Sequence, residues 1–315
     1  MSASSPAVSV VMPVYNQERY IIEAVESILR QSFTDFELII VDDGSTDATL
    51  SVLARYDDPR IRLIRAEHGG FLKALERGVL EARGQWVARM DSDDICSPQR
   101  LARQIEFLTG HPECVFVGSV YGLVTPGGKF LRPVESFDWH DYTASDITLG
   151  KELFADPSVV FDRQKALEVG LYDTDVENEK PLWYKLLTVG RAANLGEPLY
   201  YARWRIGSHS RTNVLHNKLI NNDIRHKYDP QNAAQMMTAA AGAPGKAEIG
   251  LAARGFDYYL LAGDQAAAWK VAIDCWKAWP TKPESIKLLI KALLNKRTLG
   301  NPSPPPQFIP VERPW

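Results

Sequence analysis

The stretch Val8-Ser-Val-Val-Met-Pro-Val14 is a short, almost continuous apolar run that is rich in β-branched residues. Such a run is typical of a strand that is buried on both faces of a parallel sheet. Glu37-Leu-Ile-Ile-Val41 is a second run of this kind, and between the two runs apolar residues recur at helical spacing from Ile21 to Leu29. The first unit of the chain is therefore predicted to be strand, helix and strand.

The same alternation continues along the chain. We expect helices over 47–56, 70–82 and 98–108, and extended segments over 61–64 and 86–90. Strands that alternate with helices of this length predict an α/β fold with a mostly parallel sheet flanked by helices. In such sheets, ligands bind beyond the carboxyl ends of the strands.

After about residue 115 the pattern loosens. The sequence predicts extended segments around 115–121 and 199–203, a turn over 125–129 and a helix over 181–189. From about 213 the chain is rich in Ala, Leu and Lys with helical periodicity, and from 301 it is rich in Pro. We therefore predict an α/β domain over 1–212, a helical C-terminal extension over 213–300 and a Pro-rich tail over 301–315.

Composition limits the classes of function. The 315 residues include 36 Lys and Arg against 39 Asp and Glu, a formal net charge of −3. This balance provides no overall field to attract a polyanion, so no nucleic-acid partner is expected. The three cysteines are scattered and lack the paired spacing of a zinc site or a disulfide framework. With neither a signal peptide nor an apolar run of about 20 residues, a cytoplasmic location is predicted.

Polar and acidic residues follow three of the predicted strands. The first strand runs into Tyr15-Asn16, the second into Asp42-Asp43, and the segment over 86–90 into Asp91-Ser92-Asp93-Asp94. A parallel sheet brings these loops side by side, where like charges repel unless a cation intervenes. Mg²⁺ or Mn²⁺ suits such oxygen ligands and leaves positions for substrate phosphates. Each acidic pair alone is equally typical of a turn or a helix cap, but their recurrence at successive strand ends favours a metal site.

Three motifs, Val11-Met-Pro-Val-Tyr-Asn16, Ile40-Val-Asp-Asp-Gly-Ser-Thr-Asp47 and Arg89-Met-Asp-Ser-Asp-Asp94, together with the stretch 70–88, resemble family 2 glycosyltransferases of GT-A fold. The resemblance covers roughly residues 8–210. It implies a Rossmann-like GT-A domain with a nucleotide-binding part over about 8–115 and an acceptor part over about 116–212. It also implies transfer of a sugar, with inversion, from a nucleotide diphosphate sugar, with a UDP-sugar favoured. The acceptor would be a hydroxyl of a glycan or a lipid-linked molecule in surface polysaccharide or glycoconjugate synthesis.

The resemblance implies specific roles for the loop residues. Asp93 would ligate Mn²⁺ or Mg²⁺, and Asp91 would contact the ribose or sugar of the donor. Asp42 would hydrogen-bond the nucleobase, and Asp43 would support its loop. The remaining expected donor contacts are Pro13, Tyr15, Asn16, Lys73, Ser92 and Arg205. Lys73 and Arg89 are cations that could reach phosphate, although each is equally an ordinary surface cation.

The general base is expected within Asn178-Glu179-Lys180-Pro181-Leu182-Trp183. Glu179 falls where the family usually has Asp, just before a helix, and Asn178 replaces the preceding acid. Glu179 is therefore the predicted catalytic base, with Glu177 and Asp175 as alternatives. The competing interpretation is an acidic residue that only favours the helix N-terminus.

The last motif of the resemblance spans Tyr201 to Ser210. Arg205 stands where a histidine is common, and its planar fork is suited to diphosphate oxygens. His209 is a second candidate metal ligand, or else a solvated loop residue. Trp183 and Trp204 are candidate acceptor contacts, with core packing as the alternative.

Lysines and tryptophans alternate with aliphatic residues over 269–297, which predicts basic amphipathic helices. These helices would either contact the inner face of the cell membrane peripherally or pack on the catalytic domain. Two other functions stay open. A catalytically weak sugar-nucleotide-binding protein would explain the departures at Asn178, Glu179 and Arg205, whereas a nucleotidyltransferase would need a Gly-rich loop that does not follow the first strand.

Overall fold

A computed structural model describes residues 5–133, 155–175 and 178–203, together with residues 269, 272, 273, 276, 277, 286, 287 and 290. The chain forms two compact units, Met1–Ala233 with Glu312–Trp315, and Ala234–Val311. Residues 5–133, 155–175 and 178–203 lie in the first unit. The predicted helical extension and Pro-rich tail lie almost entirely outside the described residues and stay predictions.

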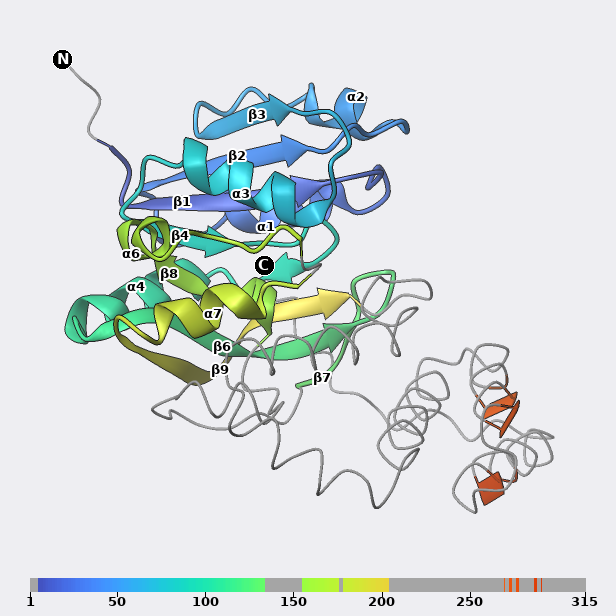
Figure 1. Ribbon diagram of the computed structural model, residues 1–315. Coiled ribbons are helices and arrows are strands. Elements are labelled where there is room, and N and C mark those ends of the chain that lie inside the picture. Colours follow the sequence, from blue (N-terminus) through green and yellow to red (C-terminus); the bar gives the residue numbers. More distant parts are fainter. Residues whose placement is uncertain are drawn as a thin grey trace. The chain divides into compact units, whose positions relative to one another are not determined.

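A nine-stranded sheet forms the centre of the described residues (Figure 1), in the order β3-β2-β1-β4-β8-β6-β9-β5, with β7 paired to β6. The strands β3, β2, β1 and β4 are parallel, which confirms the expected α/β unit. Beyond β4 the sheet is mixed, because β8 is antiparallel to both β4 and β6, whereas β6 and β9 are parallel. The strands are β1 (Val8–Val14), β2 (Phe36–Asp42), β3 (Ile61–Arg65), β4 (Trp86–Arg89), β5 (Ile95–Cys96), β6 (Cys114–Val124), β7 (Phe130–Pro133), β8 (Val160–Asp162) and β9 (Arg191–Arg203).

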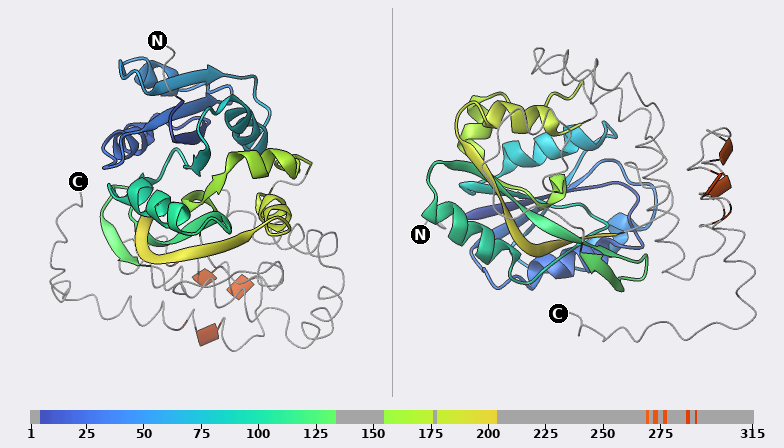
Figure 2. Two further views of the ribbon diagram at one scale, coloured as in Figure 1. Left: turned by 90° about the vertical axis from the view of Figure 1, so that its left-hand side faces the viewer. Right: turned by 90° about the horizontal axis from the view of Figure 1, so that it is seen from below.

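Helices cover both faces of this sheet (Figure 2). β1 directs Val11 into one core cluster, with residues of α3 and α7, and directs Val10 and Met12 into the other, with residues of α1 and α4. The apolar run of β1 is thus buried on both faces, as the sequence predicted. The helices are α1 (Ile21–Leu29), α2 (Thr49–Leu53), α3 (Phe71–Glu81), α4 (Arg100–Gly110), α6 (Arg163–Glu168) and α7 (Lys180–Leu186), with a 3₁₀ turn, η1 (Asp156–Ser158).

The second half of the domain differs most from the expectation. β9 begins at Arg191, well before the predicted start at 199, and β8 and α6 had no sequence prediction. Gly196 and Pro198 weaken the local β signal of β9. Pairing with β6 along almost its whole length compensates, and the register shifts where Ser119 faces Leu195 and Val120 faces Pro198.

Candidate functional site

The loops that follow β1 and β2 are tied together by Asn16. Its side-chain oxygen accepts hydrogen bonds from the backbone N–H groups of Thr46 (2.8 Å) and Asp47 (3.3 Å), and its own N–H donates to Ser45 Oγ (3.0 Å). Asn16 adopts a left-handed backbone with φ 51°, which asparagine tolerates better than most residues. Asn16 therefore shapes the edge of the site through the backbone of its neighbouring loop.

Asp43 holds the loop that leads into α3. Its carboxylate accepts hydrogen bonds from the backbone N–H groups of Gly69 (2.8 Å) and Gly70 (3.0 Å), and it lies 2.9 Å from His68 Nδ1. Gly70 has φ +98°, a conformation that side-chain-bearing residues rarely adopt. This geometry is consistent with the supporting role expected for Asp43.

An exposed aromatic surface lies over this loop. The rings of Tyr15 and His68 stack with their centroids 4.3 Å apart, and Tyr15 is 41% exposed. Asp42 is buried, and its Oδ1 has no hydrogen-bond partner among the residues that the structure describes. Flat rings beside a buried acceptor oxygen provide the stacking face and the hydrogen-bond acceptor that a nucleobase requires.

Three carboxylates gather directly after β4. One oxygen of each of Asp91, Asp93 and Asp94 lies within 4.8 Å of the others. Asp94 is buried, and it accepts hydrogen bonds from the Tyr200 hydroxyl (2.8 Å) and the Arg203 N–H (2.7 Å). Burial, followed by the charges of Asp93 and Asp91, raises the pKa of Asp94 well above its usual range. Asp91 and Asp93 are partly exposed, so the cluster has the charge, donor atoms and access that a hard divalent cation requires.

Arg203 connects this acidic loop to two other segments. Its Nε donates to the backbone oxygen of Asp93 (2.7 Å), and its Nη1 donates to that of Pro126 (2.8 Å). Its Nη2 is paired with Glu23 of α1 at 2.7 Å. The predicted turn is present here, since Gly128 N–H donates to the Thr125 oxygen (2.9 Å). Tyr200 was not among the predicted site residues, and Arg203 was expected only as the arginine of the motif that begins at Tyr201, because the pairing of β9 with β5 is what brings both to the acidic loop.

Glu179 lies at the start of α7 and makes no capping hydrogen bond with its side chain. Its carboxylate instead forms an ion pair with Nε of Arg89, and Nη2 of Arg89 lies 3.2 Å from Asp91 Oδ1. Burial raises the pKa of Glu179 well above its usual range, although Arg89 acts in the opposite direction. The surface-cation interpretation of Arg89 is wrong, because its side chain is only 4% exposed and is paired with two carboxylates.

The remaining predicted residues lie in different environments. Pro13 and Ser92 are buried, while Lys73 of α3 and Asp175 are exposed. Trp183 is fully buried against Phe116 and Phe161, and its Nε1 donates to Asp156 Oδ1 (2.9 Å). Core packing has therefore replaced the acceptor contact expected for Trp183. Four other predicted residues lie outside the described residues: Glu177, Trp204, Arg205 and His209.

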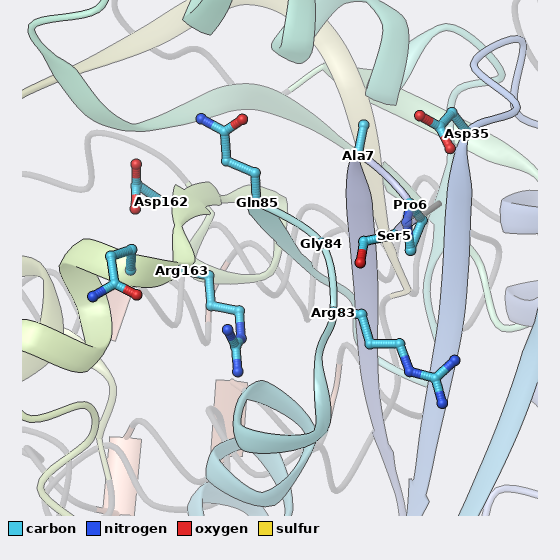
Figure 3. A pocket seen from close by; sticks show the side chains of 10 residues that line it. Ser5, Pro6, Ala7, Asp35, Arg83, Gly84, Gln85, Asp162 and Arg163 are labelled. Atoms are coloured by element: carbon cyan, nitrogen blue, oxygen red, sulfur yellow. The ribbon is translucent and has the colours of Figure 1, made fainter. Parts of the chain in front are cut away.

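The structure also has an open pocket of about 550 Å³ away from these groups. Figure 3 shows its lining, which includes Ala7, Asp35 and Gln85. These residues immediately precede β1, β2 and β4, whereas the loops of the candidate site follow the same strands. The pocket therefore lies at the amino ends of the parallel strands, at the edge opposite the candidate site.

Among the described residues, no helix is long and apolar enough to cross a membrane. In the second unit, Trp276, Ile286 and Ile290 are exposed, as are Lys277 and Lys287. The expected peripheral membrane contact stays a prediction.

The chain is similar to glycosyltransferases. The family model described as "Glycosyl transferase family 2" matches residues 9–165. The putative teichuronic acid biosynthesis glycosyltransferase TuaG of Bacillus subtilis is 32% identical over 200 residues, which span 61% of this chain and 77% of TuaG. The putative glycosyltransferase EpsE of the same organism is 44% identical over 121 residues, which span 37% of this chain and 43% of EpsE.

The fold is similar to that of S. aureus TarS. The crystal structure of TarS 1–349 in complex with UDP-GlcNAc matches with a TM-score of 0.55 and 20% sequence identity, over 91% of this chain and 80% of that chain. At this identity, the likeness shows the fold alone.

Proposed function

Because the chain belongs to glycosyltransferase family 2 and has its GT-A fold, we propose that this glycosyltransferase uses a UDP-sugar and a divalent metal ion. The acceptor would be a hydroxyl group of a glycan or a lipid-linked molecule in surface polysaccharide or glycoconjugate synthesis. The name of TuaG supports that acceptor class, and the UDP-GlcNAc complex of TarS supports the donor class.

The observation that carries the proposal is the acidic cluster of Asp91, Asp93 and Asp94. Asp94 is buried and held by two hydrogen bonds, which leaves the two partly exposed carboxylates to face a ligand. Asp93 would hold Mn²⁺ or Mg²⁺, and Asp91 would contact the ribose or sugar. The bound metal would neutralise the charge that develops on the leaving diphosphate.

The nucleotide would bind across the loops after β1 and β2. Tyr15 and His68 offer a stacking face, and Oδ1 of Asp42, which has no hydrogen-bond partner among the described residues, would accept the N–H of a uracil ring. The loop that ends at Gly70 is held in place by Asp43. These residues would therefore orient the nucleotide without taking part in bond cleavage.

Glu179 would act as the general base. It would accept the proton of the acceptor hydroxyl while that oxygen attacks the anomeric carbon opposite the leaving diphosphate, which inverts the anomeric centre. A carboxylate with a raised pKa is a better proton acceptor than an ordinary surface glutamate, and burial raises the pKa of Glu179. The ion pair with Arg89 favours the ionised form that a base requires.

Calorimetric titration with UDP, with and without Mn²⁺, tests the donor site. We expect Mn²⁺-dependent UDP binding, and we expect Asp93→Asn to weaken it by at least about tenfold, since even residues behind the ligands contribute about 10–100-fold to metal affinity. Asp35→Asn is the matched control, because Asp35 is an exposed acid at the opposite end of the parallel strands. Unchanged Mn²⁺-dependent binding in Asp93→Asn would refute the metal assignment, and a preference for GDP would redirect the donor.

A second measurement tests the chemistry. Release of UDP from a panel of UDP-sugars should require Mn²⁺ or Mg²⁺ and should fall in Glu179→Gln, while UDP affinity stays close to that of the unchanged protein. Loss of turnover in Asp175→Asn but not in Glu179→Gln would move the base to Asp175. Metal-dependent UDP binding without any turnover of UDP-sugars or transfer to glycan acceptors would favour the sugar-nucleotide-binding alternative.

A further inference from the structure

Arg89 occupies a rigid position at the end of β4. Its backbone N–H donates to the Val159 oxygen (3.0 Å), and its own backbone oxygen accepts from Nη2 of Arg100 (2.7 Å). The ring of Phe71 lies 5.0 Å from the central carbon of the Arg89 guanidinium. The guanidinium is thus attached to a fixed strand and flanked by an aromatic ring.

Two carboxylates from distant parts of the sequence meet at this guanidinium. Asp91 approaches Nη2 at 3.2 Å, and Glu179 is paired with Nε. The side chain of Glu179 is 9% exposed, and Arg89 is the ion-pair partner that the structure gives it. Nη1 of Arg89 is buried without a hydrogen-bond partner among the described residues. A buried nitrogen without a partner is costly, so the contacts with Asp91 and Glu179 are what stabilise the guanidinium in this position.

The geometry points to Arg89 as the positioning residue that fixes the carboxylate of Glu179 relative to the donor site. The inference rests on the proposed function, in which Asp91 contacts the donor and Glu179 accepts the proton. A base displaced by about 1 Å can lose about 100-fold in rate. Arg89 sets this placement because one planar group contacts both carboxylates.

The planar guanidinium group of arginine is essential to this role. A lysine would keep the positive charge, but its single ammonium cannot reproduce two contacts from one rigid plane. Arg89→Lys should therefore behave much more like Arg89→Met than like the unchanged protein. Recovery of full turnover by Arg89→Lys would show that charge alone suffices and would overturn the positioning role.

The kinetic test separates chemistry from donor binding. In UDP release from UDP-sugars with Mn²⁺, Arg89→Met should lower kcat by about 100-fold and leave KM within about threefold. If Arg89 acts through Glu179, the double variant Arg89→Met/Glu179→Gln should be no slower than Glu179→Gln alone. A double variant whose kcat falls by the product of the two single reductions would overturn the inference. So would a KM that rises by the same factor as kcat falls in Arg89→Met. Arg62→Met is the control, because Arg62 pairs with Glu37 and Glu81 away from the site.

A stability cycle tests the same pair without turnover. Removing one partner of a buried ion pair leaves the other charge uncompensated, whereas removing both relieves that cost. The thermal midpoint of the double variant should therefore be clearly higher than the sum of the two single shifts predicts. Additive shifts would overturn the pairing. A protein that shows this coupling but neither UDP binding nor turnover would contradict the proposed function alone, so the two failures are distinguishable.

Discussion

Tyr200→Phe removes a single oxygen from the support of the acidic loop. Tyr200 is fully buried, and its hydroxyl serves two partners at once. It donates to Asp94 Oδ2 at 2.8 Å and accepts from the backbone N–H of Asp91 at 3.1 Å. The substitution therefore takes one hydrogen bond from the buried carboxylate of Asp94 and one from the backbone of Asp91.

The expected cost follows from these two bonds. A hydrogen bond to a charged group contributes about 1.5–3 kcal/mol and a neutral bond contributes about 0.5–1.5 kcal/mol. Their loss should destabilise the domain by roughly 2–4 kcal/mol. For a unit of this size, 1 kcal/mol corresponds to about 2–4 °C, so the melting temperature should fall by roughly 5–15 °C. Mn²⁺-dependent UDP binding should weaken as well, because Asp94 and the backbone of Asp91 are both released.

Tyr172→Phe is the matched control. Tyr172 is also buried, but its hydroxyl has no hydrogen-bond partner among the described residues. Removing an unsatisfied buried hydroxyl should change the melting temperature little or raise it. Differential scanning fluorimetry of both variants, with and without Mn²⁺, makes the comparison. Equal midpoints for Tyr200→Phe and Tyr172→Phe would refute the assignment of the Tyr200 hydroxyl as a support of the acidic loop.

Three further changes have directions that the structure determines. Burial raises the folded-state pKa values of Asp94 and Glu179, so their contribution to stability is complete below about pH 4 and is lost as pH rises through the folded pKa values. The metal-free protein should accordingly have a lower melting temperature at pH 8 than at pH 5, and Asp94→Asn should reduce this dependence of melting temperature on pH. An equally steep dependence in Asp94→Asn would contradict the raised pKa of Asp94. Gly78→Ala should destabilise the domain by roughly 1–3 kcal/mol through overpacking, because the new Cβ would lie 2.3 Å from a methyl group of Val11 in β1. Gly110→Ala is the control, since its Cβ meets open space and the change should be neutral or stabilising. A lower urea midpoint for Gly110→Ala than for Gly78→Ala would refute this packing. Tyr15→Ala should weaken UDP binding in calorimetry by roughly 0.5–1.5 kcal/mol, the contribution of one aromatic stack, and unchanged affinity would remove Tyr15 from the nucleotide site.

The local sequence pattern was sufficient to predict the strands and helices in the first half of the domain. The runs at Val8–Val14 and Phe36–Asp42 are apolar over nearly their whole length, and only a strand covered on both faces buries such a run. The polar and acidic residues that follow the parallel strands are then placed at one edge by the sheet itself. The acidic cluster of Asp91, Asp93 and Asp94 could therefore be expected from residues close together in the chain, whereas the loop-supporting role of Asp43 was implied by the family resemblance.

The partners of these groups depend on contacts between distant segments. Arg89 has the sequence context of an exposed cation, but α7 brings Glu179 against it and buries both. Tyr200 and Arg203 reach Asp94 only because β9 pairs with β5, and Trp183 is a core residue only because α7 packs on β6 and β8. Sequence periodicity reports which face of an element is apolar, since burial of apolar surface acts locally along a strand or helix. It does not report which buried charges meet, because that choice belongs to the packing of elements far apart in the chain. Residue pattern therefore predicts the α/β fold and its polar edge, whereas packing between distant elements selects the side chains that support the proposed metal ligands and the proposed base.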